Sequence, residues 1–154
     1  HFKNANLLKH FSYNELIDTR LMLECETARL AALTVTEEDV QNLERAYDEV
    51  AATMDVPDVE FHRVDARFHM TIAECAKNRF MKEILSALQD LLVLINVSVP
   101  SGQEIRRQSC ASSRAIVDAI EAGDSELARQ LMHQHISDTG SNIRRLHWLE
   151  DNDS

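Results

Sequence analysis

Apolar residues recur along the chain at intervals of three and four, the spacing that is typical of amphipathic helices. Residues suited to helix ends divide the pattern into six segments. Ser12 with Glu15, and separately Thr36, suit N-terminal caps, while Gly123 suits a left-handed helix end before the capping residue Asp124. The predicted helices span residues 12–33, 36–50, 58–76, 79–98, 103–122 and 124–149.

The composition also favours helices. Only three glycines and two prolines occur in 154 residues, so few positions interrupt a helix. A chain of this length fits one domain and buries enough surface for a substantial core. We therefore expect an all-α fold in which residues 1–154 form a single domain.

The fourth predicted helix is apolar nearly all round its second half, between Leu91 and Ile95. Such a helix lies either at the centre of a bundle or against a partner chain, and the pattern leaves both alternatives open. We expect self-association, with a homodimer as its form. The run is interrupted by Gln89, Asp90 and Asn96 and is too short to cross a membrane, so no membrane contact is expected.

Charge and cysteine content exclude further classes. The chain has 16 basic and 26 acidic residues, a net charge of −10, and no cluster of basic residues that would bind nucleic acid directly. Its three cysteines, Cys25, Cys75 and Cys110, are odd in number and form no CxxC pair. A disulfide framework is therefore not expected, and a reducing cytoplasm fits best.

One predicted helix carries polar residues on its apolar stripe, in the run VDARFHMTIAECAKN at 64–78. Asp65 and His69 lie four residues apart and share this stripe with Phe61, Phe68 and Ile72. An ionised carboxylate in apolar surroundings lowers the stability of the fold by on the order of several kcal/mol unless a cation compensates its charge. Either a basic side chain or a divalent metal could do so.

Three more polar residues are predicted to point inward from other helices: His135, Ser113 and Arg20. His135 could complete a metal site with Asp65 and His69, because one carboxylate and two imidazoles suit zinc or nickel. The structural alternative is a hydrogen-bonded core histidine, with Arg20 and Glu24 as an ordinary ion pair on the helix flank. Spacing alone does not decide between a metal site and a buried ion pair.

Three runs together resemble a known family: DTRLMLECETARLAA, VDARFHMTIAECAKN and SSRAIVDAIEAGDSELARQLMHQHI. In order and spacing, over roughly residues 15–144, they are similar to the effector-binding, C-terminal (FCD) domain of FadR-type regulators in the GntR family. The resemblance implies an antiparallel bundle of six or seven helices around a ligand and metal cavity. It also implies a sensing domain, not an enzyme, whose operator is bound by an N-terminal winged helix that we expect to lie outside this chain.

The resemblance also implies a set of metal ligands. Asp65 and His69 match the family's D-x-x-x-H, and His135 matches the histidine of M-x-x-H. The family's EH-x-AI reads SSRAI here, so Ser113 stands where a further histidine is expected. Three ligands remain, and either water or Cys110, one turn before Ser113, could take the fourth position.

We therefore predict a transcription-regulator domain that binds a small carboxylate metabolite, with the metal, zinc or nickel, held by Asp65, His69 and His135. The predicted effector-binding residues are Arg20, Ser113 and Asn78. Two other functions remain open from the sequence. One is a metal-dependent helical enzyme, and the other is a dimerisation module with a metal-free buried polar network.

Overall fold

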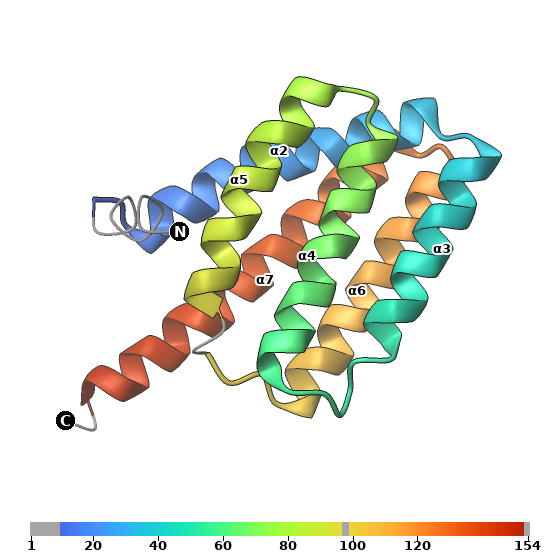
Figure 1. The fold of residues 1–154 in the computed structure, drawn as a ribbon. Coiled ribbons are helices and arrows are strands. Elements are labelled where there is room, and N and C mark those ends of the chain that lie inside the picture. Colours follow the sequence, from blue (N-terminus) through green and yellow to red (C-terminus); the bar gives the residue numbers. More distant parts are fainter. Residues whose placement is uncertain (1–9, 97–98, 153–154) are drawn as a thin grey trace.

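The computed structural model describes residues 10–96 and 99–152, with the side chains of 144–152 left aside. Within these residues the fold is all-α, with six helices and no strand (Figure 1). The helices are α2 (Tyr13–Thr34), α3 (Glu37–Ala51), α4 (Asp58–Cys75), α5 (Arg79–Asn96), α6 (Gln103–Glu121) and α7 (Ser125–Asn152). The predicted fold class is confirmed, and the predicted boundaries agree closely with those observed.

The helices begin and end for the local reasons that the sequence indicated. Ser12 Oγ accepts a hydrogen bond from the backbone N–H of Glu15 (3.1 Å), and the Glu15 carboxylate accepts one from Ser12 N–H (2.7 Å). Gly123 has a positive φ of 70°, which a glycine adopts without strain. Asp124 then caps α7 by accepting from the N–H of Leu127 (3.1 Å).

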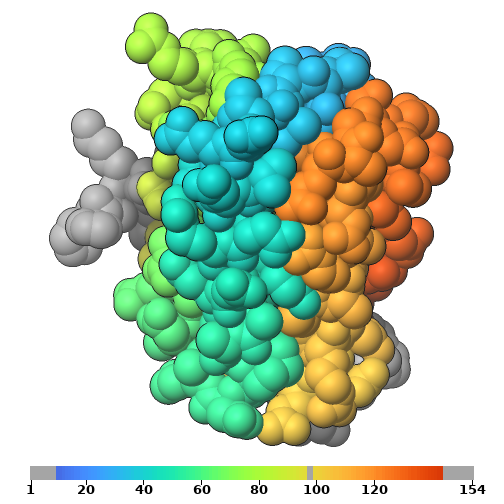
Figure 2. Space-filling model, turned by 90° about the vertical axis from the view of Figure 1, so that its right-hand side faces the viewer, coloured from blue at the N-terminus to red at the C-terminus, as the bar shows by residue number. Residues whose placement is uncertain are grey.

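The main core is formed by residues of five helices, α2, α3, α4, α6 and α7. Helix α2 packs along α7, α4 lies between α3 and α5 and also contacts α2, and α6 packs on α7 and α3. Figure 2 shows α3 and α6 side by side on one face of the molecule. The largest fully buried apolar side chains are Phe68, Leu43, Ile72, Leu85, Leu92, Ile116, Ile120, Met132 and Ile136.

Helix α5 lies at the edge of the bundle, so of the two alternatives for its apolar surround the central position does not hold. It packs against α4 and α2, and it buries Leu85 and Leu92 while Ile84 and Leu94 stay 41% and 48% exposed. Its apolar surface therefore includes a face that the described residues do not cover, and association with a second chain stays a prediction. None of the described helices, α5 included, is long and apolar enough to span a membrane.

Candidate metal and effector site

Three helices direct polar side chains into the centre of the bundle. Arg20 and Glu24 come from α2, His69 from α4 and His135 from α7, and between 0% and 3% of each residue is exposed. Each of these residues lies on the apolar stripe of its helix, and that stripe faces the core. Asp65, one turn before His69, lies at the edge of this cluster with 19% of its side chain exposed.

Asp65, His69 and His135 converge on one point. One ligand atom from each residue lies within 4.8 Å of the others. The two imidazole Nε2 atoms are 3.2 Å apart, and His69 Nε2 lies 3.8 Å from Asp65 Oδ2. Two nitrogen ligands of a tetrahedral zinc are about 3.3 Å apart, given zinc–nitrogen distances of roughly 2.0–2.1 Å. The spacing of the imidazoles therefore fits a divalent metal.

Ser112 is the partner of His135 Nδ1. Its Oγ lies 3.0 Å from the backbone carbonyl of Ser109 and 2.6 Å from His135 Nδ1, so its one proton can point to either. We assign the proton to the carbonyl, so that His135 Nδ1–H donates to Ser112 and Nε2 keeps a lone pair; the other tautomer would place an N–H of His135 between the two imidazoles. Burial, together with the neighbouring His69, lowers the pKa of His135 to about 4, so the ring is neutral at pH 7.

Glu24 defines the tautomer of His69 in the same way. His69 Nδ1 is in close contact with Glu24 Oε1, although without the alignment of a regular hydrogen bond. Burial raises the pKa of the Glu24 carboxyl, but the positive charge of Arg20 and the contacts with Arg20 and His69 outweigh it and lower this pKa to about 2. An ionised carboxylate only accepts, so the proton of His69 belongs on Nδ1 and the lone pair on Nε2.

With these tautomers two nitrogen lone pairs face each other at 3.2 Å, which is repulsive unless a cation or an N–H group lies between them. Arg20 supplies one such group, since its Nη2 lies 3.2 Å from His69 Nε2 while its Nε pairs with Glu24. A divalent metal would satisfy both nitrogens at once, and each imidazole already has the outer partner that metal-bound histidines use.

Asp65 Oδ1 at this cluster has no hydrogen-bond partner among the described residues, and neither does Ser113 Oγ on α6. A cleft enters between α4, α6 and α7, with Asp65 on one wall and His135 on another. Its two adjoining parts share the lining residues Ile105, Ser109, Thr139 and Asn142. Each part has a volume of only about 40 Å³, so the cleft as it stands admits water to the edge of the cluster.

Comparison with known families shows where this arrangement belongs. The family model described as the FCD domain matches residues 15–138, most of the chain. The chain belongs to the FCD domain family. The predicted resemblance to FadR-type regulators of the GntR family is thereby confirmed.

Relatives of this FCD domain are transcription regulators. The chain is 27% identical over 138 residues to the putative L-lactate dehydrogenase operon regulatory protein of Escherichia coli, and the match covers 85% of the chain and 51% of that protein. It is 30% identical over 120 residues to the transcriptional repressor NanR of Cronobacter sakazakii, covering 77% and 46%. The chain thus spans about half the length of these relatives. Because they are regulators, the enzyme alternative is not supported.

Solved structures share the fold. E. coli McbR/YncC superposes with a TM-score of 0.75 at 18% sequence identity, covering 88% of this chain and 68% of that one. Streptococcus agalactiae GntR superposes with a TM-score of 0.71 at 24% identity, covering 82% and 57%. At this identity the likeness supports the bundle architecture of the FCD domain and says nothing about its ligand.

Two predicted residues of the FCD domain do not reach the cluster. Asn78 is exposed in the turn between α4 and α5, where its Oδ1 accepts from the N–H of Met81 (3.0 Å), so its side chain serves as a helix cap. Cys110 is directed toward α3, where its Sγ lies 3.5 Å from the hydroxyl of Tyr47. Neither placement supports effector binding by Asn78 or a thiolate ligand from Cys110.

Two residues were missed or misjudged in the sequence. Glu24 is not on the helix flank but fully buried, and Ser112, next to the expected Ser113, is the residue that contacts His135. Glu24 lies one turn after Arg20 on the inward stripe of α2, so the helical periodicity could have predicted that Glu24 is buried. Ser113 is fully buried as predicted.

Proposed function

We propose that this FCD domain senses a small organic acid, with a divalent metal held by Asp65, His69 and His135. The observation that supports it most is the pair of Nε2 atoms 3.2 Å apart, on two imidazoles whose Nδ1 atoms each contact an outer partner. This arrangement prepares the imidazoles for a metal before it arrives. Zinc or nickel suits one carboxylate and two imidazoles.

The acid enters through the cleft beside Asp65 and His135. When bound, the metal supplies a Lewis-acidic position that accepts a carboxylate oxygen. Arg20 contributes a positive charge in the interior, and Ser113 contributes a hydroxyl that has no partner among the described residues. One relative is named for an L-lactate dehydrogenase operon, so L-lactate is the first acid to test.

The acid's effect reaches DNA through the rest of the full-length protein. With a net charge of −10, this domain is not the part that binds the operator. We propose that a winged-helix domain elsewhere in a cytoplasmic homodimer does so, and that binding of the acid changes the relative orientation of the two FCD domains.

A metal-free network is the second candidate. The contact between Arg20 Nη2 and His69 Nε2 favours it, because this N–H group satisfies one imidazole without any metal. The domain would then act through the acid and Arg20 alone, or as a dimerisation module.

Elemental analysis separates the two candidates when the protein is purified without a nickel column. We expect about one zinc or nickel per chain, together with a small acid retained in native mass spectrometry. Protein that holds no metal and takes up none from added zinc would contradict the proposal and favour the network.

A further inference from the structure

We infer that Arg20 is an internal competitor for the metal: its guanidinium occupies the lone pair of His69 that a metal needs, and metal binding releases it to receive the acid. The inference rests on the proposed metal site. It assigns Arg20 a role that couples the two ligands.

The competition follows from the geometry of one nitrogen. An imidazole nitrogen has a single lone pair, and the Arg20 N–H group points at that of His69 Nε2 over 3.2 Å. A metal bound to Nε2 must use the same lone pair. Arg20 is only 3% exposed and its Nε is held by Glu24, so its guanidinium has no solvated alternative position nearby. Metal and guanidinium therefore exclude each other at this atom.

The charges explain why the acid should follow the metal. Apart from the imidazoles, the charged side chains at the cluster are one guanidinium, that of Arg20, and two carboxylates, those of Glu24 and Asp65. The metal-free site is therefore net negative and repels a carboxylate. A divalent cation makes it net positive by one charge, which a monocarboxylate neutralises. Asp138, at the mouth of the cleft, is screened by solvent.

Displacement also changes what Arg20 can bind. Its Nε remains paired with Glu24, while the Nη2 donor that had pointed at His69 becomes free. A planar guanidinium is well suited to a carboxylate. Metal and acid should therefore bind with positive coupling, each tightening the other by the same factor.

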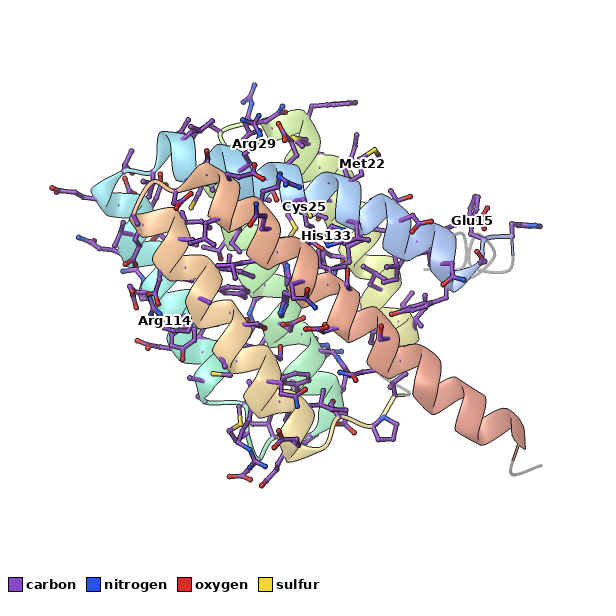
Figure 3. The ribbon with its side chains drawn as sticks, turned by 180° about the vertical axis from the view of Figure 1, so that it is seen from behind. Glu15, Met22, Cys25, Arg29, Arg114 and His133 are labelled. Atoms are coloured by element: carbon purple, nitrogen blue, oxygen red, sulfur yellow. The ribbon has the colours of Figure 1, made fainter. Side chains whose placement is uncertain are left out.

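The test uses the paired variant Arg20→Met with Glu24→Gln. Removing both charges keeps the net charge of the cluster unchanged, and the introduced glutamine would retain an oxygen acceptor for His69. The matched control is Arg29→Met with Glu26→Gln, an arginine–glutamate pair on the outer side of the same helix, where the side chains are 35% and 39% exposed (Figure 3). Zinc is titrated calorimetrically into each chelator-dialysed protein, with and without sodium acetate.

Without acetate, the Arg20 variant should bind zinc about tenfold more tightly than the wild type, and the control should not differ. Acetate should tighten zinc binding several-fold in the wild type and less in the Arg20 variant. Unchanged or weaker zinc binding by the Arg20 variant, with a zinc-binding wild type, would overturn the inference and leave the metal site standing. Zinc binding by none of the proteins would overturn both.

Circular dichroism and urea unfolding establish that each variant is folded. If the paired variant is not, Arg20→Lys serves instead, because the shorter ammonium keeps a charge beside Glu24 but withdraws the donor from His69. The same tightening of zinc binding is expected, and its absence in folded protein would overturn the inference.

Discussion

Arg20 and Arg106 are buried to a similar degree, with 3% and 5% of their surfaces exposed, but their surroundings differ. Arg106 lies 4.8 Å from the ring centre of Phe61 and donates to four backbone carbonyls and one carboxylate. These partners belong to Thr53, Met54, Val56, Ser101 and Asp58. Arg20 instead has one carboxylate and one imidazole lone pair, beside acceptors that have no partner among the described residues.

The difference separates a structural arginine from one in a ligand site. Arg106 ties the segment between α3 and α4 to the start of α6, and its donors are satisfied by the protein itself. At the cluster around Arg20 the protein leaves Asp65 Oδ1 without a hydrogen-bond partner among the described residues. Buried groups without partners cost free energy, so they indicate a bound molecule more reliably than burial of a charge does.

The largest effect on stability is expected at Arg106. The variant Arg106→Met should lower the free energy of unfolding by roughly 3–5 kcal/mol, because several buried carbonyl groups lose their donor at once. Urea unfolding of metal-free protein measures this. Arg107→Met is the control, since Arg107 is 60% exposed and pairs only with Glu104 among the described residues. Equal stability of the two variants would remove the distinction drawn between Arg106 and Arg20.

The variant Ser113→His tests the ligand site, the region compared with the structural arginine Arg106. If Ser113 stands at an incomplete metal site, an added imidazole should tighten zinc binding by about tenfold or more. Some loss of stability, roughly 1–3 kcal/mol, is expected because a larger side chain enters a fully buried position. Zinc titration and urea unfolding measure the two effects separately. A variant that folds and shows no gain in zinc affinity would argue that Ser113 does not face the metal.

Ser112→Ala tests whether the orientation of His135 matters. Removing the hydroxyl that accepts from His135 Nδ1 should weaken zinc binding by about tenfold, the lower end of the range for outer partners of metal ligands. Ser109→Ala, which keeps the backbone carbonyl that Ser112 uses, is the control. Identical zinc affinities for the two variants would contradict the assigned tautomer.

The smallest expected effect concerns stability at low pH. Burial raises the pKa of the Asp58 carboxyl, but its hydrogen bonds with Arg106 and Ser101 outweigh this and lower the pKa from 3.8. The stabilising effect is therefore present above about pH 4 and is lost as the pH falls through the lower folded-state pKa. Asp58→Asn should flatten this acid-side loss of stability by a few tenths of a kcal/mol, since the carboxylate is 37% exposed. Urea unfolding between about pH 5 and about pH 2.5, in steps of about half a unit, would show it; an unaltered slope would contradict it.

Helix positions were predictable because caps and periodicity are local properties. The segments starting at Ser12, Thr36 and Asp124 illustrate this, as does the shared inward face of Asp65 and His69. The peripheral place of α5 was not predictable, because an apolar surround does not say which faces the neighbours cover.

Contacts between helices were equally inaccessible from the sequence. The approach of Arg20 to His69 and of Ser112 to His135 depends on how α2, α4, α6 and α7 cross, and no one-helix pattern contains it. Asn78 was assigned to the effector although its position directly before α5 also favours a cap, which is its observed role. Glu24 was within reach of the helical wheel, since it shares the stripe of Arg20.

The most direct test of the metal site is a zinc titration of the chelator-dialysed wild type beside Asp65→Ala. We predict one saturable zinc per wild-type chain and binding about 100-fold weaker in Asp65→Ala, because one of three protein ligands is lost. The variant should keep its stability in the absence of metal, since Asp65 Oδ1 has no partner there among the described residues. A wild type that binds no zinc, or an Asp65→Ala variant that binds it equally well, would contradict the assignment of Asp65, His69 and His135 as a metal site.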